Sequence, residues 1–545
     1  MTGSNGGSTA VAVERGAPPA APLGRPARRR GQVHGAPGRG LQYWPEAPLY
    51  QGRFGRLFGE LPALELTEAE AAAIAARMVE PREEGASGDN EAIPSGYTYL
   101  GQFIDHDITF DPASSLQKRN DPEALVNFRT PAFDLDSVYG RGPDDQPYMY
   151  DWAPGREGRF LLGLGQNGDE FDLPRNAPPG LEPDPDSDEF TRALIGDPRN
   201  DENVLVAQLH TTMLLFHNAV MDRLQGGMDG GPVVPELEKL ASKLEGKPWR
   251  DHFLVARDVV RWHYQWVVVH DFLRRIVGDE LLGAVLARTR SRYGGRDVYR
   301  ARCDHYRPRH QAFMPVEFSV AAYRFGHSMI RNLYRLNTLV GRDPRVTIFS
   351  RDAPTTGFER LSHLGGFRRL PGFWTIEWRF FFDVGELGED EERNHSRLID
   401  SHLAFELSQL PANVATGIIA LAQRNLMRGS AMGLPSGQDV AGLLGAEPLS
   451  AEELDVGGRA APLWFYILKE AELCAGGRRL GPVGGTIVAE TFVGMLQADR
   501  SSWLRCRPGW QPFLGADGEF TMADLIRFTG YGLKPIGPPG PLPPR

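Results

Sequence analysis

The chain has 545 residues, enough for about three average domains or for one large helical domain. Its three cysteines exclude a disulfide framework and a cysteine-rich zinc array. The formal charge of -10 and the pI near 5.8 argue against nucleic acid or an anionic membrane surface as the main partner. Glycine (63) and proline (43) are more abundant than in an average protein, which predicts long, turn-rich connections.

The two ends of the chain lack the pattern of a folded segment. Residues 1–45 hold six arginines and one acidic residue among many Gly, Pro and Ala, with no apolar run after the basic residues. We therefore expect a disordered N-terminal segment rather than a signal peptide. Residues 537–545 form a proline-rich tail. No stretch reaches the ~20 consecutive apolar residues of a membrane span, so no transmembrane segment is expected.

Apolar residues recur at the helical period in many segments. The first segment starts at Thr67, a residue suited to the N-cap, and Glu70 follows three positions later as in a capping box. The clearest segment is 199–224, which is apolar along most of its length. We predict helices over 67–78, 95–106, 199–224, 249–277, 281–290, 316–333, 391–409, 414–428, 438–444, 463–473 and 483–499.

The segments between these helices are rich in turn-forming residues. Residues 110–198 and 350–385 contain repeated Pro, Gly, Asp and Asn, with a short strand or helix expected at 373–382. Strand patterns are scarce, and neither a repeat nor a linker divides the body of the chain. The sequence predicts a mainly α fold: a single large domain over 46–536, with long loops and very little β structure.

Three polar groups share one face of the predicted helix at 95–106. Gln102, Asp105 and His106 lie at offsets i, i+3 and i+4, while Phe103 and Ile104 point elsewhere. An amide, a carboxylate and an imidazole together suggest a functional site. The alternative is a surface helix end with a solvated His-Asp pair, and the residues alone leave both interpretations open.

Two further segments carry isolated polar residues in apolar surroundings. Arg199 and Glu202 lie at i and i+3 at the start of the long helix, where acidic residues also serve as simple caps. His327 is a single histidine in an apolar helix, and such a residue is more often part of the core than a ligand. His263 and His270 lack a third ligand at suitable spacing, so we interpret them as structural.

Taken together, five ordered motifs resemble the animal-type haem peroxidase family, which includes myeloperoxidase, peroxidasin and, more distantly, cyclooxygenase. The resemblance covers roughly residues 40–515. The motifs are Gly-Gln-Phe-Ile-Asp-His-Asp (101–107), Arg-Thr-Pro-Ala-Phe-Asp-Leu-Asp-Ser-Val-Tyr-Gly (129–140), Gly-Asp-Pro-Arg-Asn-Asp-Glu-Asn (196–203), Arg-Phe-Gly-His-Ser (324–328) and Arg-Asn-Leu-Met-Arg (424–428). The Ala, Gly, Arg and Pro bias fits a bacterial member with a high-GC genome.

The resemblance implies roles for residues on both faces of a haem. His327 is expected to be the proximal iron ligand. Asn425 would accept a hydrogen bond from its other ring N–H or orient that group. His106 is expected to be the distal base that takes a proton from hydrogen peroxide and returns it to the departing oxygen. Arg199 would stabilise the charge on that oxygen. Gln102 would hold water or a small anion in the same cavity.

The resemblance also implies how the haem is attached. Asp105 and Glu202 match the carboxylates that form ester bonds to haem methyl groups, so we expect a covalently linked, haem b-derived cofactor. Arg324 and Arg428 are expected to approach the haem propionates, although either could instead make an ordinary salt bridge.

A calcium loop is implied next to the distal histidine. It would use the oxygen donors that Ca2+ prefers, from Asp107, Thr130, Ala132, Asp134 and Asp136. Because Asp107 follows His106 directly, the ion would hold the distal helix in place.

The resemblance favours a peroxidase that oxidises a halide, a pseudohalide or a phenol with hydrogen peroxide, an activity tied to oxidative stress. One alternative is a fatty-acid dioxygenase of the cyclooxygenase-like type, whose radical tyrosine lies three residues before the proximal histidine. Here Arg324 holds that position, and Tyr323 is one residue too early. The other alternative is a non-catalytic haem-binding or adhesion protein. We expect a cytoplasmic or non-classically secreted protein, because no signal peptide is evident.

Overall fold

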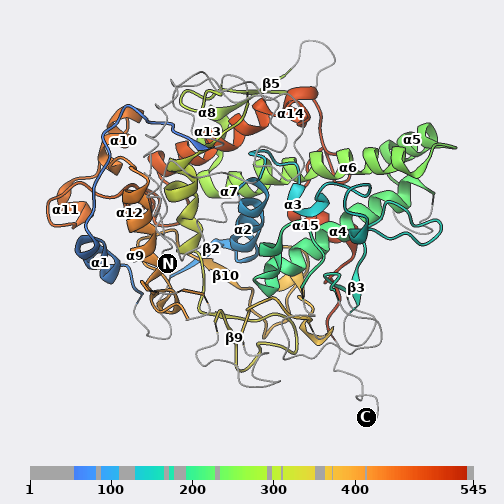
Figure 1. Cartoon of the computed structure of the whole chain (residues 1–545), viewed down its shortest axis with the longest axis horizontal. Coiled ribbons are helices and arrows are strands. Elements are labelled where there is room, and N and C mark those ends of the chain that lie inside the picture. The colour runs from blue at the N-terminus through green and yellow to red at the C-terminus, as the bar shows by residue number, and fades with distance from the viewer. Residues whose placement is uncertain are drawn as a thin grey trace, which may run out of the picture.

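The long apolar helix α4 (Val204–Leu224) lies among the other helices, as its composition predicts (Figure 1). The computed structural model of the chain describes residues 54–80, 88–109, 129–164, 171–176, 192–226, 233–290, 297–308, 311–349, 363–370, 372–411, 414–415 and 417–536. Among these residues, α4 alone is long and apolar enough to cross a membrane, and 89% of its most apolar window is buried in the protein. It is therefore a core helix. The predicted N-terminal segment and C-terminal tail lie outside the described residues.

Among the described residues, four helices make the most extensive contacts with α4. They are α2 (Gly96–Ile108), α5 (Pro235–Leu244), α6 (Trp249–Trp266) and α15 (Met522–Thr529). The helix predicted over 249–277 is confirmed as one continuous rod, in which α6 passes through a π-helical stretch, η6 (Val267–Leu273), into α7 (Arg274–Val277). The short α3 (Asp136–Tyr139) packs between α2 and α4.

The other helices form a second group, on the left and at the top of Figure 1. They are α1 (Glu68–Arg77), α8 (Asp279–Val285), α9 (Leu421–Ala431), α10 (Gly437–Leu444), α11 (Ala451–Leu454), α12 (Leu463–Ala475), α13 (Pro482–Ala498) and α14 (Trp503–Cys506). The contact between α12 and α13 joins the two sides of this group. Thr67 and Glu70 make the predicted capping box at α1.

Strands are short and pair only in twos among the described residues. The pairs are β1 (Phe54–Gly55) with β7 (Met314–Pro315), β2 (Asp89–Pro94) with β10 (His395–Arg397), β3 (Gly163–Leu164) with β4 (Phe171–Asp172), β5 (Leu286–Arg290) with β6 (Asp297–Ala301), and β8 (Leu333–Tyr334) with β9 (Val346–Thr347). The β1-β7 pair is parallel and the others are antiparallel. The expectation of a mainly α fold with very little β structure is confirmed.

Two predicted helices were wrong because strand pairing overrides the local pattern. The helix predicted over 281–290 ends at Val285, and the next five residues form β5, which pairs with β6. The helix predicted over 391–409 is instead β10 followed by a single 3-10 turn, η12 (Phe405–Ser408). A periodic apolar pattern in a short segment fits either a helix or a strand, so pairing with a partner strand determines which of the two forms.

Three further segments differ in detail from the prediction. The region 316–333 is a π-helical turn, η7 (Glu317–Ala321), followed by a 3-10 helix, η8 (Ala322–His327). The region 414–428 becomes helical only at α9. The segment 373–382 contains two 3-10 turns, η10 (Gly372–Trp374) and η11 (Trp378–Phe380).

The start of the long helix at 199–224 is also interrupted. A 3-10 turn, η5 (Pro198–Asp201), comes first and is capped by Asp197, whose side chain accepts from the Arg199 backbone N–H. Asn203 then caps α4 in extended geometry by accepting from the Leu205 N–H. Asp197 caps the turn and Asn203 caps the helix, so the two are separate elements. The break matters because Arg199, Asn200 and Glu202 all lie in or beside this turn.

The burial of His217 on α4 leads to a testable pH effect. Its Nε2–H donates to Gly158 O, its Nδ1 accepts from the Tyr139 hydroxyl, and aromatic rings enclose it. Burial lowers the pKa of His217 from 6.5 to about 4. Between these values the unfolded chain binds a proton that the folded chain does not, so stability is lost as the pH falls.

We expect the stability difference between the natural chain and His217→Gln to shrink by about 2.5 kcal/mol between pH 7 and pH 4.5, measured by urea unfolding. The natural chain is the more stable at pH 7 and loses this advantage in acid. His402→Gln, at a half-exposed histidine, serves as the control and should show no such change. A constant difference across this pH range would contradict the assignment of a neutral buried His217.

Candidate active site

The distal and proximal histidines predicted from the sequence lie on elements that pack together. His106 is near the end of α2, and His327 ends η8. The Tyr323 hydroxyl, on η8, donates to the backbone carbonyl of Gly101 on α2 at 3.1 Å. The fold therefore brings together two segments more than 200 residues apart in the sequence.

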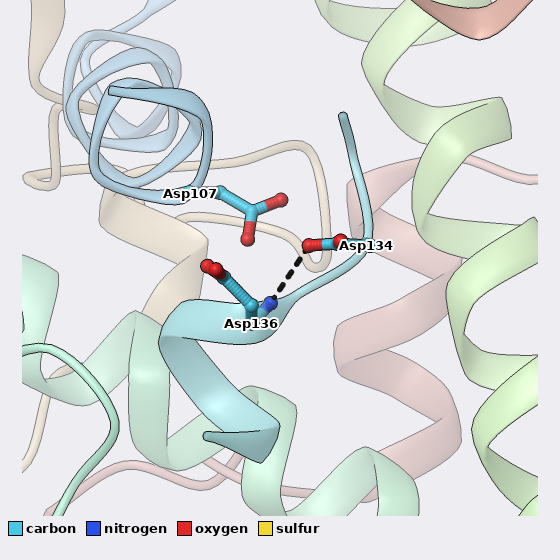
Figure 2. A group of neighbouring side chains, drawn as sticks. All are labelled: Asp107, Asp134 and Asp136. Carbon is cyan, nitrogen blue, oxygen red and sulfur yellow. Dashed lines mark hydrogen bonds between the residues drawn. The ribbon is translucent and has the colours of Figure 1, made fainter. Parts of the chain in front are cut away.

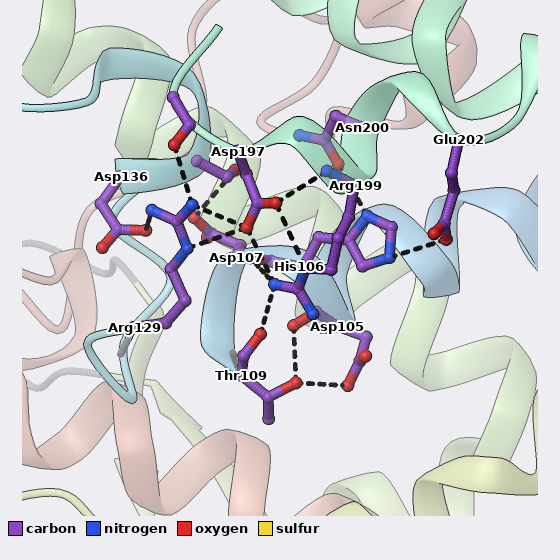
Figure 3. A network of polar contacts seen from close by, with 12 residues as sticks. Asp105, His106, Asp107, Thr109, Arg129, Asp136, Asp197, Arg199, Asn200 and Glu202 are labelled. Atoms are coloured by element: carbon purple, nitrogen blue, oxygen red, sulfur yellow. Dashed lines mark hydrogen bonds and ion pairs between the residues drawn. The ribbon is translucent and has the colours of Figure 1, made fainter. Parts of the chain in front are cut away.

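The imidazole of His106 is held on both of its ring nitrogens (Figure 3). Its Nδ1 lies 2.8 Å from Asn200 Oδ1, and its Nε2 lies 3.4 Å from Glu202 Oε1. Gln102 Nε2 donates to the same Glu202 oxygen at 2.6 Å. Three of the predicted site residues, Gln102, His106 and Glu202, thus form one cluster.

The carboxylate of Glu202 is stabilised in its charged form. Burial raises its pKa, but the contact with His106 and the charges of His106 and Arg199 outweigh burial, so the pKa lies below its ordinary value. The other predicted attachment residue, Asp105, accepts from the Thr109 hydroxyl one turn further along α2 at 2.9 Å. Both carboxylates therefore lie at the same end of α2 as His106.

The ring of His327 is held by Asn425 from α9. Asn425 Nδ2 lies 2.8 Å from His327 Nδ1, while the Asn425 Oδ1 accepts from Arg324. Burial, assisted by the charge of Arg324, lowers the pKa of His327 to about 3, so the ring is neutral. In this arrangement Asn425 orients the ring but does not accept an N–H from it. Iron binding through Nε2 requires the hydrogen on Nδ1, and therefore requires the Asn425 amide to turn over.

Two guanidinium groups lie near the proximal turn. Burial and the neighbouring charge of Arg428 lower the pKa of Arg324 to about 10, and Asp105 opposes this only in part. No heavy atom lies within 4 Å of the place that a side chain on Gly326 would occupy, so there is open space beside this turn. Two cations beside open space are suited to a ligand that carries carboxylates.

The orientation of the Arg199 side chain differs from the one that the resemblance implies. Its guanidinium donates to both carboxylate oxygens of Asp197 and to the backbone carbonyls of His106 and Thr109. Figure 3 shows this group and the imidazole edge that faces Glu202 pointing in different directions. In this structure Arg199 holds the backbone at the end of α2.

Asp197 continues the network towards a cluster of acidic residues. Its Oδ2 accepts from Arg129 at 2.6 Å, and Arg129 Nη1 donates to Asp136 at 3.2 Å. Asp197 is fully buried. Burial raises its pKa, but Arg199 and Arg129 lower it far more, so it remains charged.

Asp107, Asp134 and Asp136 form the acidic cluster (Figure 2). One carboxylate oxygen from each lies within 4.8 Å of the others. Burial, followed by the charge of Asp136, raises the pKa of both Asp107 and Asp134 well above the ordinary value. Such a group of hard oxygen donors could hold a cation. Thr130 and Ala132, the other expected ligands, lie in the same loop.

The remaining histidines and cysteines are arranged as the sequence suggests. His263 contacts Val259 O and the Phe513 N–H, and His270 stacks on Trp266, so the two do not form a metal pair. The three cysteines are unpaired.

Sequence reasoning did not assign a role to four residues of this network. Arg129, Asp197 and Asn200 lie inside the motifs, and His210 follows on α4, where its ring nitrogen lies 2.9 Å from Asn200 Nδ2. One signal was present for His210, because it is a polar residue in a helix that is apolar along most of its length. The contacts themselves are tertiary and leave no spacing pattern.

Residues 113–352 match the family model described as animal haem peroxidase. Over 297 residues the chain is 25% identical to a peroxidase-like protein of Margaritifera margaritifera. That match covers 46% of this chain and 33% of the relative, so the chain spans about a third of the relative's length.

Two solved structures share the fold. Peroxidase A of Dictyostelium discoideum superposes with a TM-score of 0.56 at 16% identity, covering 89% of this chain and 94% of the other. A fatty acid alpha-dioxygenase of Arabidopsis thaliana gives a TM-score of 0.54 at 13% identity, covering 93% and 87%. The match over residues 113–352 identifies an animal haem peroxidase domain within the chain, and the solved structures share its fold.

Proposed function

We propose that the chain is a haem peroxidase, which reduces hydrogen peroxide while oxidising a halide, a pseudohalide or a phenol. The observation that carries this proposal is the pairing of His106 and His327. They come from packed elements, and each Nδ1 is held by an asparagine amide, from Asn200 and Asn425 respectively. On the other edge of its ring, His106 Nε2 lies 3.4 Å from Glu202, and an ester link at Glu202 would leave this atom for chemistry.

The residues around His327 fit a haem. The ring is neutral, as an iron ligand must be, and Arg324 and Arg428 provide positive charge for two propionates. A propionate that draws Arg324 away from Asn425 would also free the amide to turn and accept the His327 Nδ1–H. Asp105 and Glu202 are proposed to form the ester links, since both lie at the end of α2 that carries His106.

Bound haem would supply the redox chemistry that splits the O–O bond and oxidises the donor. The chain's own residues would move the proton: His106 takes it from peroxide at Nε2 and returns it to the departing oxygen. Gln102 provides an amide beside the same edge. Arg199 is proposed to add positive charge on the distal side, from its position on the His106 carbonyl.

A fatty-acid dioxygenase is the second candidate, because solved fatty acid alpha-dioxygenases share the fold. Arg324 holds the position of the radical tyrosine expected in that class, and the hydroxyl of Tyr323 is engaged with Gly101 O. Oxygen uptake with a polyunsaturated fatty acid, measured without a peroxidase donor, separates the two candidates. A non-catalytic haem-binding protein would give a haem absorption band and neither activity.

The distal base is tested by His106→Ala. We expect peroxide-dependent oxidation of bromide, iodide, thiocyanate or a phenol to fall by about 10²- to 10⁴-fold, because the variant cannot transfer the peroxide proton. Stopped-flow kinetics on haem-loaded protein measures the change, and the Soret band should persist because His327 is intact. His402→Ala, at a half-exposed histidine, is the matched control. Normal turnover in His106→Ala would refute the proposed mechanism.

We also propose that Asp107, Asp134 and Asp136 bind Ca2+, with Thr130 and Ala132 completing the site. An ion there would relieve the repulsion between the buried carboxylates. At a hundredfold excess over Kd, Ca2+ should raise the Tm by about 2 to 3 °C, as measured by calorimetry. Asp134→Asn should weaken this effect, whereas Asp304→Asn, at a side chain that is 85% exposed, should preserve it. An equal response of the natural chain and Asp134→Asn would rule the site out.

A further inference from the structure

Asn200 lies between two buried histidines. Its Oδ1 is 2.8 Å from Nδ1 of His106, and its Nδ2 is 2.9 Å from Nδ1 of His210. Asn200 and His210 have no exposed surface, and His106 is 4% exposed. The bridge joins α2 to α4 through η5, and no water-accessible partner competes with it.

An amide bridge makes the hydrogen positions of the two rings depend on each other. A primary amide donates only at its nitrogen and accepts only at its oxygen. The Nδ1 of His106 faces the amide oxygen and therefore carries a hydrogen. The Nδ1 of His210 faces the amide nitrogen and therefore carries none. Burial lowers the pKa of His210 to about 3, so this ring is neutral and carries a single hydrogen, on Nε2.

The position of the His210 ring is fixed by its surroundings. The ring packs edge to face against Phe103 of α2, with centroids 6.2 Å apart, and Phe103 packs in turn against Tyr264 of α6. Three helices thus enclose the ring. A ring held in this way keeps its Nδ1 beside Asn200 Nδ2.

We propose that Asn200 and His210 are positioning residues for the distal imidazole. Asn200 accepts the Nδ1–H of His106, and His210 holds the amide in this orientation by accepting from its nitrogen. Glu202 Oε1 lies 3.4 Å from the other nitrogen, Nε2, and a charged carboxylate there would favour a hydrogen on it. With Glu202 uncharged, as the proposed ester requires, the unprotonated atom of His106 is Nε2, which is the atom that must receive the peroxide proton. The reversed amide would place a hydrogen on Nε2 and leave it unable to act as a base. This inference rests on the proposed role of His106.

The hydrogen positions can be measured without any turnover. The full chain with Glu202→Gln, which removes the carboxylate charge as the ester would, is labelled with 15N-histidine, loaded with diamagnetic zinc protoporphyrin and studied by 15N NMR. The His106 and His210 signals are assigned from His106→Gln and His210→Asn. We expect hydrogen on Nδ1 of His106 and on Nε2 of His210. Hydrogen on Nε2 of His106 would overturn the proposal. Because this result does not depend on activity, it stands apart from the test of the proposed function.

Variants at position 200 separate positioning from simple packing. Asn200→Leu removes both contacts, and we expect the peroxide reaction to slow by about 100-fold at equal haem content. Asn200→Asp keeps an acceptor for His106 Nδ1–H, and the rate should return to within about tenfold of the natural rate. Equal losses in the two variants, or a loss below twofold in Asn200→Leu, would overturn the proposal.

Variants on α4 test the role of His210 in the same way. His210→Asn offers an amide oxygen near the position of the ring Nδ1, whereas His210→Leu offers no acceptor. We expect the leucine variant to show mixed hydrogen positions on His106 and a slower peroxide reaction, and the asparagine variant to restore both. Thr211→Val is the matched control, since its hydroxyl bonds only the Ala207 carbonyl one turn back on the same helix. Retention of the natural hydrogen positions in His210→Leu would refute the role of His210.

Discussion

The buried carboxylate of Asp197 is the interaction on which the distal half of the site depends. It lies between the guanidinium groups of Arg129 and Arg199 and also caps the turn that carries Asn200. Removing one partner of a buried ion pair costs about 3 to 5 kcal/mol, because the remaining charge is left in a poorly solvating interior. This side chain therefore helps to fix the turn that carries Asn200, together with the ion pair between Arg175 and Asp201 in the same turn.

The network around Asp197 connects the acidic cluster to the distal histidine by two routes. One route is covalent, because Asp107 follows His106 directly on α2. The other passes from Asp136 through Arg129 and Asp197 to the turn before α4. A cation at the cluster would neutralise the carboxylates that now compete for Arg129, so the charge on the cluster and the geometry of the distal side are physically linked.

The sequence predicted those parts of the fold and site that depend on local patterns. Each of three such features lies within a single segment of the chain: the capping box at α1, the apolar length of α4, and the motif carrying His106. The strand β5 was missed because its partner, β6, is separated from it by a loop. The orientation of Arg199 was missed for a similar reason: its acceptors include the backbone carbonyls of another element, and no spacing in the sequence records them.

His106 and His327 are each held by an asparagine amide, but the two amides differ in how firmly they are oriented. On each side an asparagine amide faces Nδ1 of the ring, and a third residue sets the direction of the amide: His210 for Asn200, and Arg324 for Asn425. His210 is enclosed by three helices, so the partner of the Asn200 amide stays in place. Arg324 is a cation, and a carboxylate is a stronger acceptor for it than an amide oxygen. An anionic ligand would therefore release the Asn425 amide from Arg324, whereas it would leave the contact between Asn200 and His210 unchanged.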